Sequence, residues 1–492
     1  MAANADKSPP SSKLNGKNFM VRHTKIVATL GPSSSNPDML ETLIRAGVNV
    51  VRLNFSHGKS DDHIQLAAEV RRISEKVGRP VGILADLQGP KIRIGKFAEG
   101  KIYLDSGDHL ILDAQCELGN QERVGLDYKD LPDDVKVGDI LLLDDGNIVL
   151  EVESVSGHEI FTVVQQGGEL SNNKGINRQG GGLSAPSLTA KDMDDIKIAA
   201  QIGADFLAVS FPKSASDMYM ARQLMLATGG HALTIAKIER AEAIAALDEI
   251  LDASDGLMVA RGDLAVEVGN ATVPALQKRM IRRAREKNKL AITATQMMES
   301  MTHSPTPTRA EVSDVANAVL DGTDAVMLSG ETAVGEYPVE TVETMARICQ
   351  EAEKSLPITL DQGFLDRTFT RIDQSIAMAT LFAAYHLDVK AVAAFTTTGS
   401  TVLWMSRLNC GIPIFALTEE ASARLRMTLF REVFPLLMTE MNNDRDILRH
   451  NAEKCLLDAG VVKKGDLIVL SYGDKMGHAG GTNTMTIVRI GG

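Results

Sequence analysis

The sequence predicts an α/β protein: a (β/α)8 TIM barrel with an inserted small β-barrel domain and a C-terminal α/β domain. Short apolar runs alternate with segments of helical periodicity, which indicates parallel strands joined by right-handed crossovers. Eight such runs occur, and the stretches that contain them, 21–95 and 184–353, together approach the ~250 residues typical of this barrel. An open doubly wound sheet would require the count of eight to be coincidental.

Three of these strands precede the insertion and five follow it. A helix after the first strand is predicted to begin at Asn36, with Pro37 in its first turn. The fifth strand runs directly into Lys237 and Glu239, so it ends in two opposite charges. The predicted strands are 25–30, 48–54, 81–86, 206–210, 233–240, 256–260, 291–295 and 325–329.

The insertion, residues 96–183, is recognised by short strands separated by glycine turns, which is the pattern of antiparallel hairpins. It ends in the run Gly180-Gly181-Gly182, which suits a hinge and equally a plain flexible linker. The expected strands include 101–104, 109–112, 140–143 and 148–152. Residues 354–492 form the C-terminal domain, with expected strands 391–395, 412–416 and 467–470 and helical segments between them.

Composition excludes several classes of protein. The net charge of -12 argues against sequence-independent nucleic-acid binding, and no apolar run approaches the length that spans a bilayer. The four cysteines are far apart, so neither a zinc knuckle nor a disulfide framework is expected. A reducing, cytoplasmic location fits best. Residues 1–20 resemble no targeting peptide and are expected to be a disordered extension.

The strand ends carry the chemistry, because the carboxyl ends of all eight strands meet at one face of a barrel. Glu239 and Asp263 follow neighbouring strands and offer the oxygen ligands that Mg2+ prefers. Arg52, Arg93 and Lys237 would neutralise a phosphoryl group in transit. The alternatives are an acid pair that balances nearby cations and arginines in surface salt bridges. Other groups at the strand ends are Asn54, Ser56, Asp86, Lys91, Arg261, Gly262, Thr295, Gln296, Ser329, Gly330 and Glu331.

Six motifs in order resemble the pyruvate kinase family, and the resemblance covers the chain from about Val21 to the C-terminus. The motifs lie at 52–58, 233–244, 258–264, 294–300, 307–312 and 327–332. The resemblance implies transfer of a phosphoryl group from phosphoenolpyruvate to ADP, which gives pyruvate and ATP. It also implies a divalent cation, Mg2+ or Mn2+, held by Glu239 and Asp263.

The resemblance further implies roles for individual residues. Lys237 would offset the charge of the phosphoryl group and the enolate, and the backbone at Gly262 and Asp263 would hold the substrate carboxylate. Thr295 and Ser329 would belong to the route that delivers a proton, through water because a threonine hydroxyl is a poor acid. Phosphate or nucleotide contacts are implied for Arg52, Arg93, Asn54, Pro32, His57 and Lys174, the last of which would make the inserted domain a lid.

One position departs from the family pattern. Members that need K+ carry a glutamate where this chain has Lys91. A fixed ammonium can supply the charge that K+ would otherwise provide, so activity without K+ is predicted. The residues that usually ligate K+ are otherwise largely retained: Asn54, Ser56, Asp86 and the position of Leu87.

The turn after the first clear strand of the C-terminal domain resembles the family's effector pocket, because hydroxyls and backbone amides at a helix start suit a phosphate monoester. A structural N-cap turn would look the same. The turn consists of Thr396, Thr397, Thr398, Gly399, Ser400 and Thr401, and residues 480–484 would form a facing wall. No pair of basic residues for a second phosphate is evident, which favours a sugar monophosphate or AMP over a bisphosphate.

Two other interpretations stay open at the level of sequence. One is another Mg2+-enolate barrel enzyme, of the aldolase or phosphoenolpyruvate mutase type. The other is a catalytically silent regulatory or binding subunit that keeps the fold. The resemblance implies a homotetramer, which the sequence cannot give from first principles.

Overall fold

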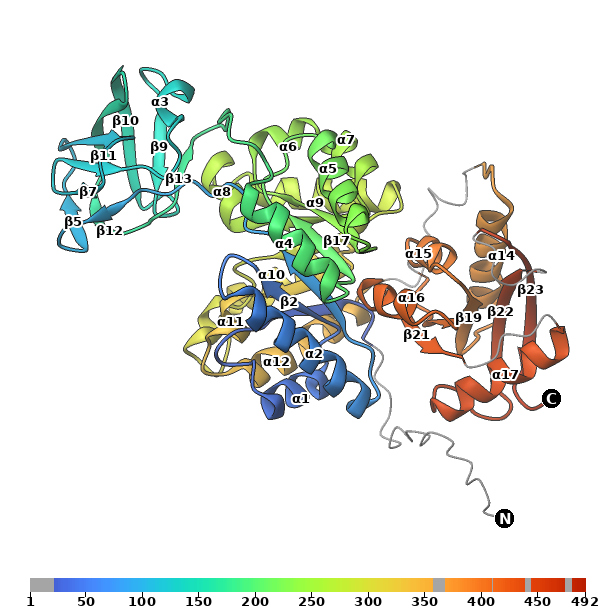
Figure 1. The fold of residues 1–492 in the computed structure, drawn as a ribbon. Helices are drawn as coiled ribbons and strands as arrows, with labels where there is room; N and C mark the ends of the chain where they lie inside the picture. Colours follow the sequence, from blue (N-terminus) through green and yellow to red (C-terminus); the bar gives the residue numbers. More distant parts are fainter. Residues whose placement is uncertain (1–21, 357–367, 409, 439–443, 474–479) are drawn as a thin grey trace, which may run out of the picture.

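Eight parallel strands form a closed barrel in the middle of the molecule (Figure 1), in the order β1-β18-β17-β16-β15-β14-β3-β2. The structure is a computed structural model that describes residues 22–356, 368–408, 410–438, 444–473 and 480–492. The predicted fold class and all eight barrel strands are confirmed, and the extension 1–20 lies outside the described residues. The strands are β1 Lys25–Thr29, β2 Val50–Asn54, β3 Gly82–Asp86, β14 Phe206–Val209, β15 Leu233–Ile238, β16 Gly256–Ala260, β17 Leu290–Ala294 and β18 Ala325–Leu328.

The helices that surround the barrel begin where the sequence offers capping residues. Asn36 caps α1 by accepting a hydrogen bond from the Met39 amide at 2.9 Å, as predicted. Thr189 and Thr308 form capping boxes at the starts of α4 and α10. The elements are α1 Pro37–Ala46, α2 Ser60–Val77, α4 Ala190–Gln201, α5 Ala215–Ala227, α6 Ala241–Ala245, α7 Leu247–Ala253, α8 Arg261–Val268, α9 Val273–Glu286, η1 Glu299–Thr302, α10 Arg309–Leu320, α11 Gly330–Ala333 and α12 Pro338–Lys354.

The inserted domain leaves the barrel after β3 and returns before α4, and it projects from one side of the barrel (Figure 1). Its main sheet has the order β13-β9-β10-β11-β6-β8, and two parallel pairs, β6 with β8 and β4 with β7, interrupt the expected antiparallel pattern. Its elements are β4 Lys96–Phe97, β5 Lys101–Leu104, β6 His109–Asp113, β7 Leu118–Gly119, β8 Arg123–Gly125, α3 Leu131–Asp134, β9 Ile140–Leu143, β10 Ile148–Ser156, β11 Glu159–Gln166, β12 Gly168–Ser171 and β13 Ile176–Arg178.

The C-terminal domain has a five-stranded sheet with the order β21-β20-β19-β22-β23. The expectation of helices alone between the second and third strands is wrong, because β21 lies there and pairs with β20. Its elements are α14 Ile372–His386, β19 Ala391–Phe395, α15 Ser400–Ser406, β20 Ile414–Thr418, α16 Ala421–Arg426, η2 Met427–Leu429, β21 Val433–Leu437, α17 Arg445–Asp458, β22 Leu467–Gly473 and β23 Thr482–Arg489.

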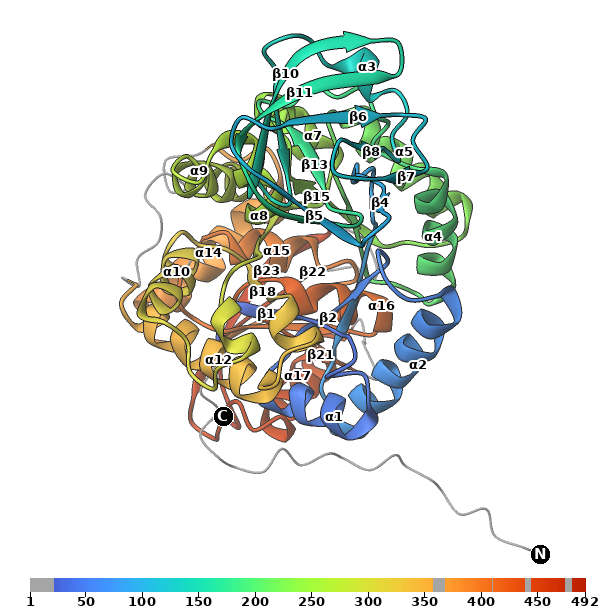
Figure 2. The same cartoon turned by 90° about the vertical axis from the view of Figure 1, so that its left-hand side faces the viewer.

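The two added domains lie on opposite sides of the barrel. The C-terminal domain covers the amino ends of the strands, where the Lys25 ammonium donates to the Val433 carbonyl at 2.7 Å and Arg407 pairs with Asp324. The inserted domain lies on the side of the carboxyl ends, and the view from that side shows it in front of part of the barrel (Figure 2). No described helix is long and apolar enough to cross a membrane.

Candidate active site

Lys237, near the end of β15, is the centre of a buried network of charges. Its ammonium lies 3.0 Å from the Glu239 carboxylate and 3.2 Å from the Asp86 carboxylate, and it donates to the Ser210 hydroxyl at 2.7 Å. Burial acts to lower the pKa of Lys237, but the two carboxylates outweigh burial and hold the pKa above its ordinary value. Lys237 is therefore a fixed positive charge at the barrel mouth.

Arg52, on β2, completes this network from the other side of Asp86. Its Nε donates to Asp86 at 2.6 Å and its Nη1 donates to the Thr29 hydroxyl at 3.1 Å. Burial would raise the pKa of Asp86, yet Lys237 and Arg52 hold that pKa below its usual value. Asp86 thus bridges the two cations.

Glu239 and Asp263 follow the paired strands β15 and β16. Glu239 is 1% exposed and its second carboxylate oxygen accepts the Phe211 amide at 2.8 Å. Burial raises the pKa of Glu239, the Asp263 carboxylate raises it further, and Lys237 opposes both. Two neighbouring carboxylates, one buried and one partly exposed, carry negative charge that a hard divalent cation would offset, so these residues fit Mg2+.

Lys91 contacts Asp263 of this acid pair. Its ammonium lies 2.9 Å from Asp263 and 3.9 Å from Asp145 of the inserted domain. Burial lowers the pKa of Lys91, but Asp263 and the other acids outweigh burial and raise it overall.

The residues expected around K+ have other partners. The Asn54 side-chain oxygen accepts the Ser56 amide at 3.1 Å, and the Leu87 carbonyl accepts the Ser210 hydroxyl at 2.7 Å. Asp86 is held by Arg52 and Lys237. In this structure the positive charges beside Asp86 come from side chains.

Thr295 follows β17 with φ of +64°, a conformation that a β-branched residue rarely adopts. Its hydroxyl accepts the Gly262 amide at 2.9 Å and donates to the Ala294 carbonyl at 2.7 Å. Arg261 donates to the Thr295 carbonyl at 2.6 Å and is itself bound by both oxygens of Asp314. Arg261 therefore fixes the strained turn that brings Thr295 and Gly262 together.

Ser329 follows β18, and its amide donates to the Glu331 carboxylate at 2.7 Å. Glu331 is fully buried and also accepts the Met298 amide at 3.1 Å. The same carboxylate thus holds the turns after β17 and β18.

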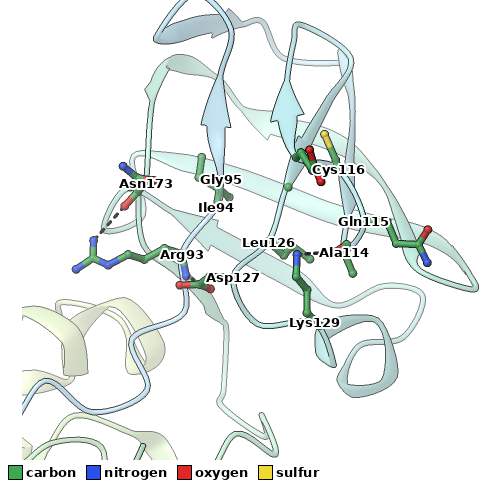
Figure 3. A pocket seen from close by; sticks show the side chains of 12 residues that line it. Arg93, Ile94, Gly95, Ala114, Gln115, Cys116, Leu126, Asp127, Lys129 and Asn173 are labelled. Atoms are coloured by element: carbon green, nitrogen blue, oxygen red, sulfur yellow. Dashed lines mark hydrogen bonds between the residues drawn. The ribbon is translucent and has the colours of Figure 1, made fainter. Parts of the chain in front are cut away.

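Arg93 and Lys174 lie together at the base of the inserted domain. The Arg93 guanidinium donates to the Asn173 carbonyl at 3.0 Å (Figure 3). The Lys174 ammonium lies 2.6 Å from Asp144. A hollow of about 650 Å³ borders Arg93 there and is also lined by Asp127, Lys129 and Cys116. Pro32 and His57 are exposed on the barrel, whereas Arg93 and Lys174 are bonded within the inserted domain, to Asn173 and Asp144.

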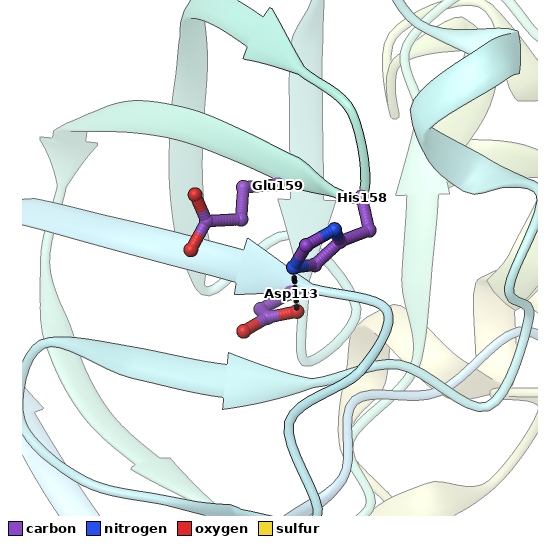
Figure 4. A group of neighbouring side chains, drawn as sticks. All are labelled: Asp113, His158 and Glu159. Carbon is purple, nitrogen blue, oxygen red and sulfur yellow. Dashed lines mark ion pairs between the residues drawn. The ribbon is translucent and has the colours of Figure 1, made fainter.

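A second cluster of acids and a histidine lies in the inserted domain, formed by Asp113, His158 and Glu159 (Figure 4). Arg123 donates to Asp113 at 2.9 Å and to Glu159 at 3.0 Å. Because Arg123 already balances the negative charge of Asp113 and Glu159, we interpret this cluster as an ion-pair network of the sheet and not as a metal site.

The turn 396–401 joins β19 to α15. The Gly399 amide donates to the Thr396 hydroxyl at 2.8 Å, and the Thr401 hydroxyl lies 3.2 Å from that of Thr482 on β23. The start of β23 therefore faces the turn. Arg371, which the sequence analysis did not single out, approaches this wall beside Gly480.

Sequence reasoning missed two residues that support the site. Ser210 ends the fourth predicted strand, and its place there was the signal that could have added it to the strand-end groups. Asp314 lies on α10, away from any strand end, and nothing in the sequence connects it with Arg261.

A barrel whose strand ends combine an acid pair with a charged lysine and an arginine defines an enzyme of phosphoryl transfer that uses a divalent cation. Comparison with known proteins agrees. The family models "Pyruvate kinase, barrel domain" and "Pyruvate kinase, alpha/beta domain" match residues 21–342 and 374–488. The chain belongs to the pyruvate kinase family and is a phosphotransferase.

Curated relatives match almost the whole chain. "Pyruvate kinase II" of Salmonella typhimurium is 51% identical over 476 residues, 96% of this chain and 99% of the relative. The pyruvate kinase of Haemophilus influenzae is 52% identical over 459 residues, 92% of this chain and 96% of the relative. That of Mycobacterium tuberculosis is 43% identical over 475 residues, again 96% and 99%.

Proposed function

We propose that the protein transfers the phosphoryl group of phosphoenolpyruvate to ADP, giving pyruvate and ATP in glycolysis. The observation that carries this proposal is the buried Lys237 ammonium, held between Asp86 and Glu239 beside the acid pair. The family supports it, because the relatives are named pyruvate kinases over nearly their full length. The alternatives of an aldolase or mutase type and of a silent subunit lose support for the same reason.

Lys237 and Arg52 neutralise the phosphoryl group while it moves, and Lys237 then stabilises the enolate that remains. Both side chains are fixed by Asp86 before substrate arrives, so little reorganisation is needed in the transition state. Mg2+, or Mn2+ in its place, would be held by Glu239 and Asp263 and would neutralise substrate oxygens. The backbone at Gly262 and Asp263 holds the substrate carboxylate.

Thr295 and Ser329 guide the proton that converts enolate to pyruvate. The Thr295 hydroxyl donates to the Ala294 carbonyl, so its own proton is engaged. A water molecule oriented by these hydroxyls therefore delivers the proton.

The inserted domain acts as a lid over the nucleotide. Arg93 and Lys174 hold phosphates from the lid side, and Pro32, Asn54 and His57 approach the nucleotide from the barrel. Closure of the lid excludes water from the transfer.

Activity does not require K+, because Lys91 supplies a fixed positive charge 2.9 Å from Asp263. Asn54, Ser56, Asp86 and Leu87 then serve the structure of the site rather than a bound monovalent ion.

A phosphorylated sugar or AMP binds the turn 396–401 and activates the enzyme. The hydroxyls of Thr396, Thr397, Thr398, Ser400 and Thr401 supply hydrogen bonds to one phosphate, and the Gly399 amide, which donates to the Thr396 hydroxyl, holds the turn.

The protein assembles as a homotetramer. Exposed apolar side chains on α14 and on the edge strand β23 support a self-complementary face, which includes Phe382, Tyr385 and Ile487.

Coupled detection of pyruvate from phosphoenolpyruvate, with and without ADP and Mg2+, tests the proposed reaction. We expect turnover only with both, and loss of at least about a thousandfold in kcat for Lys237→Met. The matched control is Lys197→Met, because Lys197 is exposed on α4 and forms an exposed ion pair with Asp194. Equal rates with and without ADP would instead support the aldolase or mutase alternative. Unchanged turnover in Lys237→Met would contradict the role of Lys237, and absence of turnover in the wild type would support the silent subunit.

A further inference from the structure

The exit from the lid is fastened to the barrel by two glutamates that the proposed mechanism does not use. Gly180, Gly181 and Gly182 all have positive φ, at +81°, +78° and +91°. The Gly182 amide donates to the Glu242 carboxylate, and the Gly180 amide donates to the Glu267 carbonyl at 3.2 Å. This glycine run is therefore a defined turn with fixed partners.

At the centre of this turn, a residue other than glycine would be strained at φ of +78° and would displace the Glu242 carboxylate. A Cβ atom at Gly181 would lie 2.3 to 2.8 Å from the three carboxyl atoms of Glu242. On the lid side, Arg178 donates to the Gly181 carbonyl at 3.0 Å and is held by both oxygens of Asp139. The turn is consequently hydrogen-bonded both to the lid and to the barrel.

The two glutamates each follow a member of the acid pair closely in the chain. Glu242 is in α6, three residues after Glu239, and Glu267 is in α8, one turn after Asp263. The Glu267 carboxylate accepts the Ala241 amide at 2.9 Å, which ties α8 to the start of α6. The hinge thus rests on the two segments that hold the acid pair.

We propose that Glu242 and Glu267 are positioning residues that hold the exit hinge of the lid, residues 180–182, against α6 and α8. They determine the orientation of the lid relative to the bound nucleotide, so this inference rests on the lid function proposed above. Glu242 acts directly, through the Gly182 amide, and Glu267 acts through its neighbour Glu242 and through α8.

The pair also gives the hinge a dependence on pH. Burial, the largest cause, and the Glu242 carboxylate together raise the pKa of Glu267 to about 7, against the Ala241 amide, Arg240 and Asn177, which lower it. Lys213 faces Glu242, and one Glu242 oxygen is buried without a hydrogen-bond partner among the described residues. When pH rises through about 7, Glu267 loses its proton, the two carboxylates repel each other, and the hinge loosens.

Hydrogen exchange of residues 178–185 and steady-state kinetics test the proposal with the full-length enzyme. For Glu242→Ala we expect faster exchange in the hinge and a KM for ADP about tenfold higher, the effect of one lost charge-assisted hydrogen bond. The KM for phosphoenolpyruvate and kcat should stay within about twofold. Glu242→Gln keeps an acceptor oxygen, so its hinge exchange and its KM for ADP should lie between those of the wild type and Glu242→Ala. Glu249→Gln on α7 is the matched control, because Glu249 is exposed.

A pH profile separates positioning from a merely structural role. Between about pH 6 and pH 8 the KM for ADP should rise in the wild type and rise less in Glu267→Gln, which cannot ionise. The proposal is overturned if Glu242→Ala matches the control in exchange and in KM for ADP, or if the wild type and Glu267→Gln share one pH profile. Absence of ADP-dependent turnover in the wild type would overturn the proposed function instead, while hinge exchange would still test the contact.

Discussion

Asp324 joins the barrel to the C-terminal domain, and its substitution tests how much this buried ion pair contributes to the stability of the protein. It is fully buried and immediately precedes β18. Its two oxygens accept four hydrogen bonds: two from Arg407, one from the Ala291 amide at 2.9 Å and one from the Arg431 amide at 3.0 Å. Asp324→Asn removes the charge and turns one acceptor into a donor that faces other donors.

The expected cost follows from burial. Arg407 is 2% exposed, so the variant leaves a buried guanidinium without its counter-charge. Breaking one partner of such a pair costs about 3 to 5 kcal/mol, whereas an exposed pair contributes about 0 to 1 kcal/mol. With a urea m-value of about 3 kcal/mol/M, the unfolding midpoint should fall by about 1 to 1.7 M.

Trp404 makes the measurement specific, because it is the one tryptophan of the chain and lies in α15, close to Arg407. Urea unfolding followed by its fluorescence should show the shift, and Asp194→Asn, which removes an exposed pair with Lys197, should show almost none. In Asp324→Asn/Arg407→Met the buried charge is gone, so the double variant should lose less than the sum of the two single variants. Equal midpoints for Asp324→Asn and Asp194→Asn would refute the reasoning.

Three further predictions concern the barrel mouth and the hinge. Ser210→Ala should lower kcat by about fivefold in the coupled pyruvate assay, because Lys237 loses a 2.7 Å hydrogen bond of about 1 kcal/mol. Ser210→Thr should recover part of the rate. Equal rates for the two variants and the wild type would contradict this role of Ser210. The wild type should turn over with tetramethylammonium as the only monovalent cation, whereas Lys91→Glu should need KCl; a wild type that is inactive until KCl is added would contradict K+ independence. Glu267 binds its proton more tightly in the folded protein, with a pKa of about 7 against an ordinary 4.5, so stability is lost as pH rises between these values. Urea midpoints should therefore fall over this range in the wild type relative to Glu267→Gln, and parallel curves would contradict the assignment.

The barrel was predictable because its strands are buried on both faces and read as apolar runs. The two missed strands of the C-terminal sheet lack that signal. β21 contains Pro435, which argues against a central strand but is tolerated here because β21 lies at the sheet edge. β23 is rich in threonine and half exposed at the other edge, so its pattern resembles a polar loop.

For the site, the gathering of Lys237, Glu239 and Asp86 followed from the rule that strand ends meet at one face. What could not follow from it is any contact that depends on a helix or on side-chain reach. Asp314 reaches Arg261 from α10, and Lys91 reaches Asp263 across the start of the lid. Spacing along the chain encodes neither contact, because both depend on how separate elements pack.

The contacts of α8 connect the lid to the acid pair at both of its junctions with the barrel. At the entry, Lys91 pairs with Asp263 in the first turn of α8, and at the exit Gly180 binds the Glu267 carbonyl in the next turn. A change in the angle of the lid therefore acts on one short helix from two directions, at the residue that would hold the divalent cation and one turn beyond it. Because Lys91 also lies 3.9 Å from Asp145 of the inserted domain, the proposed closure of the lid would move a positive charge relative to Asp263. Lid position and the electrostatics of the phosphoryl-transfer site are thus linked through α8.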